Sequence, residues 1–254
     1  MTIDPDPLLD SIDILTTADG AQWPAHVHDD HELLSAITHS VTVVTPDAVY
    51  IAPRGTSIWI PAGVVHEVTA APGNSMRCTW FEPDAEAMLT SRVVVTTVPP
   101  LLDRVLAELV RYTDPPRRAR AEAFALDLLA DSRETDVGLP TPASPWLRAV
   151  TDALIADPAD RRTVDAWATQ ASVSVRTFMR QFAAETGMTF SRWRAELRLQ
   201  LAMSMLANGD EVGRTARTVG FESLAAFSAA FRRRAGVSPR TFARTHGSVT
   251  DFRA

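Results

Sequence analysis

The spacing of apolar residues in this 254-residue chain changes at Pro99 and Pro100. Before these prolines, apolar residues alternate with polar ones or form short runs that proline and glycine interrupt, as in 41–53, 56–70 and 76–83. Many short strands of this kind predict a β-sandwich or a β-barrel. After the prolines the apolar residues follow the 3.6-residue period of an α-helix. The sequence therefore predicts a two-domain α+β chain, with a β domain first and helices after it.

Two amphipathic helices are expected directly after the β domain. Their apolar faces hold Leu102, Val105, Leu106, Leu109 and Val110 in the first helix, and Ala121, Phe124, Ala125 and Leu128 in the second. The helices (98–132) form either a hairpin packed inside one chain or a surface that pairs two copies, and we expect a homodimer. Residues 133–144 are polar and rich in proline and glycine, which predicts a linker. The pattern is helical from there to about residue 246.

Charge is distributed unevenly between the two halves of the chain. Residues 1–144 carry 9 arginines and 21 acidic residues, a net charge of −12. Residues 145–254 carry 16 arginines and 10 acidic residues, a net charge of +6. A basic region inside an acidic chain predicts a polyanionic partner for that half alone.

Several classes of protein are disfavoured. The single cysteine, Cys78, cannot form an internal disulfide or supply a thiolate metal cluster. No apolar run approaches the roughly 20 residues needed to span a bilayer. The acidic N-terminal segment lacks the positive region of a signal peptide. We therefore expect a cytoplasmic protein with no membrane partner.

Two stretches of the basic half share one pattern. Residues 163–190 and 212–242 each predict a short helix, a tight turn and a second helix that carries arginines. We expect Ser174 to cap the second helix of the first stretch, and Glu222 or Ser223 to cap that of the other. Both second helices hold two phenylalanines four residues apart: Phe178 and Phe182, Phe227 and Phe231. A helical bundle with a solvated basic face is the alternative, but a tandem pattern favours two DNA-binding helix-turn-helix units.

Residues 163–244 closely resemble the DNA-binding domain of the AraC/XylS transcriptional regulators, down to the segments "VGF", "FSAAFRR" and "GVSPRTF". The resemblance implies two helix-turn-helix units that enter successive major grooves on one face of the DNA. It places two sets of residues toward the bases: Arg176, Thr177, Met179 and Arg180 in the first unit, and Leu224, Ala225, Ser228 and Ala229 in the second. Phosphate contacts are assigned to Arg232, Arg233 and Arg240.

The first unit is expected to supply most of the base specificity, because its base-facing positions carry two arginines whereas those of the second offer one polar side chain. Arg180 is the strongest candidate, since an arginine can donate two hydrogen bonds to guanine. The second unit would contribute contacts to thymine methyl groups and anchor the phosphates.

A second motif lies in the β domain. His26 and His28 are two residues apart, so on a strand they face the same way, and Glu32 follows four residues later. Downstream, Gly55, Pro61, Gly63 and His66 follow the spacing G-x5-P-x-G-x2-H. With Gly20 placed six residues before His26, these stretches resemble both signature motifs of the cupin superfamily over residues 20–70. Two positions depart from that pattern, His39 and Ala70, and neither is a ligand.

The resemblance implies a metal site of three imidazoles and one carboxylate, formed by His26, His28, Glu32 and His66. This donor set suits Fe, Mn, Ni, Cu or Zn. The alternative is a barrel that keeps these side chains but binds an unknown organic effector or nothing.

These observations predict an AraC-type transcription regulator, not an enzyme. A cupin-like sensor barrel (12–97) would bind a metal ion or a small molecule and modulate operator binding by the DNA-binding domain (145–246). Two rival interpretations stay open: a metal-dependent dioxygenase or isomerase fused to a DNA-binding domain, and a constitutive DNA binder whose barrel is purely structural. Turnover of a small substrate by the barrel would favour the enzyme, whereas ligand-dependent operator affinity without turnover would favour the sensor.

Overall fold

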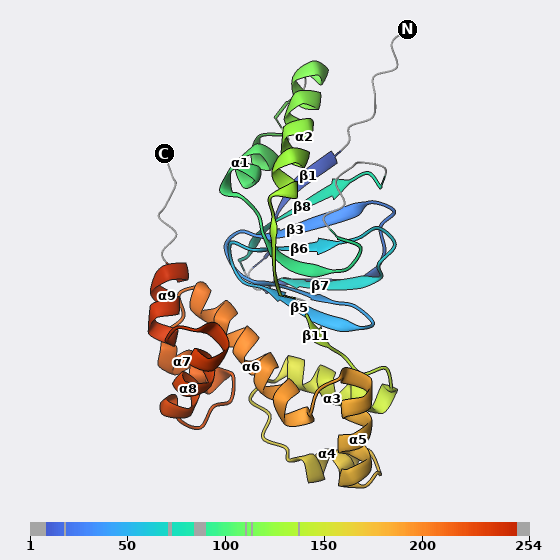
Figure 1. Ribbon diagram of the computed structural model, residues 1–254, viewed down its shortest axis with the longest axis vertical. Coiled ribbons are helices and arrows are strands. Elements are labelled where there is room, and N and C mark those ends of the chain that lie inside the picture. Colours follow the sequence, from blue (N-terminus) through green and yellow to red (C-terminus); the bar gives the residue numbers. More distant parts are fainter. Residues whose placement is uncertain are drawn as a thin grey trace. The chain divides into compact units, whose positions relative to one another are not determined.

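The computed structural model describes residues 9–17, 19–70, 73–83, 90–109, 111–112, 114–136 and 138–247. The chain divides into two compact parts, a β domain and a helical domain (Figure 1). The β domain comprises the residues up to Thr45 and Tyr50–Gly138, and the helical domain comprises Pro46–Val49 and the residues from Leu139 onward. No helix among the described residues is long and apolar enough to span a membrane.

Two sheets build the β domain, and Figure 1 shows one above the other. The order of the first sheet is β1-β8-β3-β6-β9-β10, with strands β1 (Leu9–Leu15), β3 (His31–Ala36), β6 (Ser57–Ile60), β8 (Ser75–Phe81), β9 (Val94–Thr97) and β10 (Arg133–Asp136). The second sheet has the order β11-β5-β4-β7-β2, with strands β2 (Ala21–His26), β4 (Val41–Val44), β5 (Ala48–Ala52), β7 (His66–Ala70) and β11 (Leu139–Pro140). Neighbouring strands run antiparallel. The predicted β domain of many short strands is confirmed.

Strand β3 is buried along its whole length, because structure covers both of its faces. Successive side chains of a strand point to opposite faces. Leu33 accordingly lies in an apolar cluster with Trp59 and Phe81. Glu32 points the other way, toward His66 of the second sheet. The alternation of β3 thus places one carboxylate in the space between the sheets.

Helices α1 (Pro100–Leu109) and α2 (Pro115–Ala130) cover the first sheet. Leu102, Leu106 and Leu109 of α1 are buried in the same cluster as Leu33 and Trp59. The apolar face of α1 therefore packs inside the chain, as the first of the two alternatives for the hairpin predicts. Val110, also assigned to this face, lies outside the described residues.

The buried face of α2 differs from the prediction. Phe124 is 45% exposed, and the buried apolar residues are Ala125 and Leu129. Arg118 explains the difference, since it donates to the buried carboxylate of Glu122 at 2.8 Å and to a backbone carbonyl of β1. This polar pair lies on the inner side of the helix, so the apolar stripe is rotated away from Phe124.

The stretch expected as a linker, 133–144, begins as a strand. β10 pairs with β9, and Thr96 donates to the Arg133 carbonyl at 2.8 Å. The division between the two domains falls at Gly138 and Leu139. The short strand β11 (Leu139–Pro140) follows and pairs with Ala48 and Val49, which belong to the helical domain.

Seven helices make up the helical domain within the described residues: α3 (Pro145–Ala156), α4 (Val164–Gln170), α5 (Val175–Thr186), α6 (Phe190–Ala207), α7 (Val212–Thr218), α8 (Leu224–Ala235) and α9 (Pro239–Gly247). Helices α4 and α5 form the first helix-turn-helix unit, and α7 and α8 form the second. The long helix α6 connects the two units in the chain (Figure 1). The predicted tandem arrangement is confirmed.

Helices α5 and α8 begin at caps that the sequence predicts. Ser174 caps α5 by accepting from the Thr177 backbone N–H at 3.1 Å, and Ser223, not Glu222, caps α8 in the same way. Such a cap contributes about 1 kcal/mol. Each helix ends at a glycine with left-handed backbone, at 187 and 236. The phenylalanine pairs are fully buried beneath both helices, which fixes the opposite face toward solvent.

Candidate metal centre and nucleic-acid interface

The exposed face of α5 carries the residues expected to contact bases. Arg176, Met179 and Arg180 are exposed, and Met179 keeps 48% of its surface in solvent although it is apolar. Thr177 differs from them, because it is half-buried and its hydroxyl lies 2.8 Å from that of Ser174. The cap therefore engages Thr177, and the two arginines are the polar groups that project freely.

Helix α8 presents a more apolar surface. Leu224, Ala225 and Ala229 are exposed, Leu224 at 53%, and Ser228 is half-buried. Met179 of α5 and Leu224 of α8 are large apolar side chains that are exposed to solvent. Base methyl groups in a major groove are one surface that could cover them.

The five arginines that the sequence assigns to DNA are available to an anionic partner: Arg176, Arg180, Arg232, Arg233 and Arg240. All are exposed, and none forms a salt bridge with an acidic side chain in the part of the chain that the structure describes. Arg232 and Arg233 lie in the last turn of α8, where their charge also complements the negative end of the helix dipole. An unpaired guanidinium can neutralise a phosphate without first breaking an ion pair.

The second site lies where the two sheets of the β domain meet. His26 ends β2 and is paired directly with His66 at the start of β7, and a register shift precedes it in the ladder. His28 follows in the loop before β3, and Glu32 lies near the start of β3. One ring nitrogen from each of the three histidines lies within 4.8 Å of the others. The structure thus brings together all four residues that the motif spacing singled out.

Backbone contacts fix the orientation of two of the imidazoles. The Nδ1 atom of His26 lies 2.7 Å from the Pro24 carbonyl, and that of His66 lies 2.9 Å from the Val64 carbonyl. A carbonyl oxygen only accepts, so Nδ1 carries a proton in each ring, and in the neutral form of the ring Nε2 keeps a free lone pair. This tautomer is the one that binds a metal through Nε2, with the outer hydrogen bond setting the ring.

The Glu32 carboxylate lies close to the Nε2 atoms of His66 and His28. Its Oε2 atom is 3.3 Å from His66 Nε2 and 3.7 Å from His28 Nε2. The side chains of Glu32 and His66 are almost fully buried, at 4% and 1% exposed, yet neither Oε2 nor Nε2 has a partner in hydrogen-bond geometry among the described residues. Buried polar atoms without a partner are rare, because each costs about 1–3 kcal/mol.

Neighbouring groups of the site shift the pKa values of His28 and His66. Burial alone would lower the pKa of His66, but the Glu32 carboxylate and the Val64 carbonyl together raise it. Burial lowers the pKa of His28, and the imidazoles of His26 and His66 act in the same direction, whereas Glu32 opposes them. Burial also raises the pKa of the Cys78 thiol, so that Cys78 offers no thiolate to a metal.

The four residues fit a transition-metal ion. Their ligand atoms converge, two rings have the required tautomer, and a cation would satisfy the two unpartnered atoms of Glu32 and His66. His28 is 30% exposed, so one side of the cluster is open to solvent. Trp80, which the sequence did not single out, lies beside this side with its ring 6.0 Å from that of His28.

Two supporting contacts were also not apparent from the sequence. His31 is buried, and its Nδ1 accepts from the Ala62 N–H at 2.8 Å. Gly63, in the loop before β7, donates to the His28 carbonyl at 2.9 Å. Together they hold the loop that carries His28 against the loop that precedes His66. His39, which replaces the glycine of the family motif, does not adopt the left-handed backbone of a tight turn; its N–H donates to the Asn74 side chain.

Comparison with known proteins identifies the class of both domains. Residues 12–129 match the family model of the AraC-like ligand binding domain, and residues 167–245 match a helix-turn-helix domain model. The chain belongs to the AraC/XylS family of transcriptional regulators. This AraC/XylS-family member is a DNA-binding transcription regulator with a ligand-binding domain, as predicted.

Relatives of this AraC/XylS-family regulator are regulators too. It is 29% identical over 222 residues to the HTH-type transcriptional regulator NimR of Escherichia coli K12, and the match covers 85% of the chain and 80% of NimR. It is 41% identical over 103 residues to the HTH-type transcriptional regulator RipA of Corynebacterium glutamicum, a match that covers 41% of the chain and 31% of RipA. The families and relatives are regulators, so the enzyme interpretation is set aside.

Solved structures of similar proteins include ToxT of Vibrio cholerae with a bound unsaturated fatty acid. It is 13% identical, with a TM-score of 0.39, and the match covers 96% of this chain and 97% of ToxT. The C-terminal domain of AraT, a response regulator from Geobacillus stearothermophilus, is 24% identical with a TM-score of 0.40. That match covers 44% of this chain and 93% of the AraT domain.

Proposed function

We propose that the β domain binds a divalent first-row transition metal through His26, His28, Glu32 and His66, and that occupancy of this site changes the affinity of the helical domain for operator DNA. One observation carries the proposal. Glu32 Oε2 and His66 Nε2 face each other at 3.3 Å, buried and without hydrogen-bond partners, beside two further imidazoles.

An apolar replacement of such a pair would commonly be neutral or stabilising, so folding alone gives little reason for a buried carboxylate here. A bound cation would supply positive charge to the carboxylate and accept the lone pairs of the imidazole nitrogens. The donor set suits Fe, Mn, Ni, Cu or Zn alike.

The metal proposal concerns regulation because the domain is joined to a DNA-binding domain. A ligand shifts the operator affinity only if it binds the DNA-bound and the free states of the protein with different affinities. An organic effector that binds the β domain instead of a metal is the alternative, and the open side of the cluster near Trp80 would be where such a molecule reaches the three histidines.

In the DNA-binding domain, we propose that α5 supplies most of the base specificity. Arg180 is the main reader, with Arg176 and Met179 beside it, because these side chains are exposed and the arginines lack acidic partners among the described residues. Helix α8 would add apolar contacts to thymine methyl groups through Leu224, Ala225 and Ala229, with Ser228 as its polar group. Arg232, Arg233 and Arg240 would bind phosphates, so the affinity falls steeply with salt.

A homodimer stays a prediction. The apolar face of α1 that suggested it is buried against the β domain of the same chain, and the exposed apolar residues nearby are Leu101 and Phe124. Sedimentation velocity of the full chain with Phe124→Ser beside the parent tests this point. A dimer in the parent and a monomer in the variant would place the interface on α2, and two monomers would reject the dimer.

Metal content tests the main proposal. The full chain is purified without an affinity tag or chelator, reconstituted anaerobically with first-row ions and analysed by plasma mass spectrometry. His66→Ala should lose a near-stoichiometric metal, whereas His39→Ala, which removes a histidine of the same domain outside the cluster, should keep it. Operator affinity is then measured with and without the ion. Metal-free parent protein would reject the site, and equal affinity in both states would reject its regulatory role.

A further inference from the structure

The loop between α3 and α4 is held in one conformation by its own side chains. Asp157 accepts from the Ala159 N–H at 3.0 Å. The Asp160 carboxylate accepts from Arg162, from its backbone N–H at 2.7 Å and its Nε at 2.8 Å. These hydrogen bonds from Arg162 lower the pKa of Asp160 and so favour the ionised carboxylate that accepts them. The carbonyl oxygens of the loop are therefore presented in fixed positions.

Two arginines of α6 bind these carbonyl oxygens. Arg194 donates to the carbonyls of Arg162 and Asp160, the first at 3.0 Å. Both carbonyls belong to the loop that leads into the first helix-turn-helix unit. Arg194 therefore attaches the loop to α6 without contacting the second unit through these bonds.

Arg198, one helical turn further along α6, reaches both units. It donates from Nε to the Pro158 carbonyl at 2.8 Å and from Nη2 to the Asp160 carbonyl at 3.3 Å. It also donates from Nη1 to the Gly220 carbonyl at 3.0 Å, in the turn between α7 and α8. We call this set of three hydrogen bonds the arginine bridge. A single planar guanidinium thus joins the loop before the first unit to the turn of the second.

The turn at Gly220 lies so close to the bridge that only glycine fits. Its φ is +82°, a left-handed conformation that side chains disfavour. A Cβ atom here would lie 2.7 Å from the Ala159 Cα and 2.7 Å from Arg198 Nη2. The backbone of the turn at Gly220 therefore packs directly against the backbone of the loop at Ala159, and no side chain fits between them.

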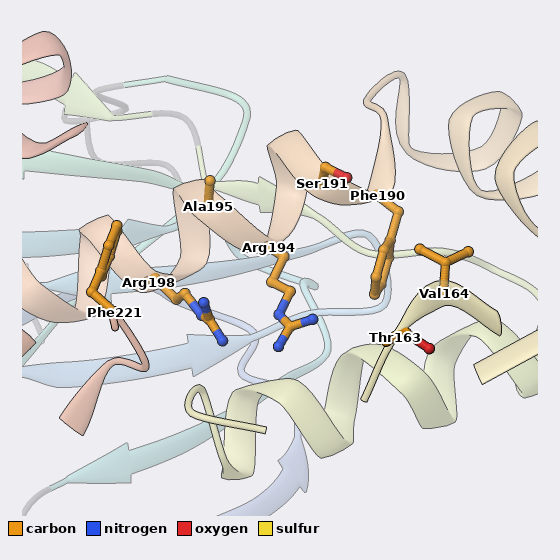
Figure 2. Close-up of a pocket in the computed structure, with 8 residues that line it drawn as sticks. All are labelled: Thr163, Val164, Phe190, Ser191, Arg194, Ala195, Arg198 and Phe221. Carbon is orange, nitrogen blue, oxygen red and sulfur yellow. The ribbon is translucent and has the colours of Figure 1, made fainter. Parts of the chain in front are cut away.

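Figure 2 shows both guanidinium groups projecting from α6 on one side, with Phe221 at one end of the group and Thr163 and Val164 at the other. They line a recess of about 380 Å³. Both guanidinium groups are partly removed from water, and this burial lowers the pKa of Arg194 and of Arg198. Removing a charge from water is unfavourable, so the directed hydrogen bonds must offset that penalty.

Apolar contacts also attach the second unit to α6, through Phe227 and Phe231 packed with Leu199, Ala202 and Leu206. Close packing of these side chains holds the unit on the helix, and the Arg198 guanidinium adds hydrogen bonds of fixed direction to that packing. A guanidinium with its donors in one plane constrains the angle strongly, and lysine cannot reproduce that geometry. The exposed pair between Arg161 and Glu222 spans the same gap but, at 78% and 81% exposed, contributes little.

We propose that Arg198 is a positioning residue that fixes the distance and angle between α5 and α8, and thereby sets the spacing of the two DNA half-sites that the protein binds. The inference rests on the proposed base contacts of α5 and α8. Its physical basis is effective concentration: when one reading helix is bound, a rigid connection holds the other at the correct place in the next groove. A looser connection lowers that concentration and tolerates other spacings.

The test uses the full chain and DNA that the parent protein selects from random-sequence duplexes. Three probes are then compared by gel shift: the selected site, the same site with one half scrambled, and the site with one base pair inserted or removed between the halves. Arg198→Met is the test variant, since it keeps an aliphatic stem and removes the donors. Arg194→Met is the matched control, because it removes the same charge from the same helix and loop but leaves the contact with Gly220.

We expect Arg198→Met to bind the selected site about tenfold more weakly and the half-scrambled site within about twofold of the parent, since only the coupling between units is lost. The penalty for a changed spacing should shrink in this variant. Arg194→Met should weaken both sites by the same factor and keep the spacing penalty of the parent. An unchanged spacing penalty in Arg198→Met, or an equal loss on whole and half sites, would overturn the inference.

Two further results separate this inference from the proposed base contacts. If the parent selects no two-part site, the assignment of α5 and α8 as joint readers fails, whatever Arg198 does. Should Arg198→Met fold poorly by circular dichroism, Gly220→Ala replaces it, because the added Cβ pushes the turn away from Ala159 while Arg198 keeps its charge. That variant is expected to show the same reduced spacing penalty, and a parent-like penalty would count against the bridge.

Discussion

Replacing Glu32 by glutamine tests the metal centre with a minimal change. The variant keeps the size and shape of the side chain but removes the negative charge that lies 3.3 Å from His66 Nε2 and 3.7 Å from His28 Nε2. A neutral amide oxygen is a poor ligand for a divalent transition metal. We therefore expect metal to stabilise the parent protein far more than Glu32→Gln.

The size of the effect follows from linkage. Metal at 100 times the dissociation constant of the parent stabilises the fold by about 2.7 kcal/mol. A ligand loss that weakens binding about 100-fold brings the same metal concentration to one dissociation constant, where the stabilisation is only about 0.4 kcal/mol. At about 3–5 °C per kcal/mol, the metal should raise the Tm of the parent by about 8–13 °C and that of the variant by about 1–2 °C.

Scanning calorimetry with Mn²⁺ and with Zn²⁺ measures these shifts. Each protein is compared with its own metal-free state, so a change in intrinsic stability cancels. Glu67→Gln is the matched control, because Glu67 lies next to His66 on β7 and alternation points it to the opposite face. Equal metal-induced shifts in the parent and Glu32→Gln would refute the assignment of this carboxylate as a ligand.

Three further predictions concern the helical domain. Arg180→Ala should cost about 1–3 kcal/mol at the selected site and relax the preference at one base position; an unchanged preference in a footprint assay would show that another residue reads it. Arg233→Ala should weaken specific and non-specific binding alike and lower the salt slope by about 1, and a loss confined to the specific site would contradict its phosphate role. Burial alone would raise the pKa of Glu185, but hydrogen bonds from Ser144 lower it, so its contribution to stability is present above the ordinary value of 4.5 and is lost as the pH falls through the lowered one. In Glu185→Gln the free energy of unfolding should therefore fall less steeply as the pH is lowered. If urea titrations show the same fall in the variant and the parent, the hydrogen bonds from Ser144 to Glu185 are not its cause.

Local patterns carried most of the prediction of the fold. The change of period at Pro99 and the caps at Ser174 and Ser223 depend on neighbouring residues, which the sequence presents directly. The buried face of α2 was misassigned because it depends on Arg118, whose partner on β1 is 109 residues away. The spacing of apolar residues along a helix does not show which of its side chains will bind a distant strand.

The candidate sites show the same limit. Motif spacing brought His26, His28, Glu32 and His66 together correctly, because strand alternation and pairing translate spacing into position. Spacing could not reveal that His31 is buried or that Arg198 joins two units, since both depend on backbone N–H and carbonyl groups of distant loops. Such groups are the same for every residue, so a sequence carries no signal for which of them a side chain will meet.

The four proposed ligands come from both sheets, with Glu32 on the first and His26 and His66 on the second. An ion held there would tie together segments 34 residues or more apart in a chain whose one cysteine rules out an internal disulfide. Losing the ion would remove this connection between the two sheets and expose this end of the domain to proteases. Because a change of about 1–2 kcal/mol alters cellular abundance several-fold, metal supply would govern how long the regulator survives as well as how tightly it holds its operator.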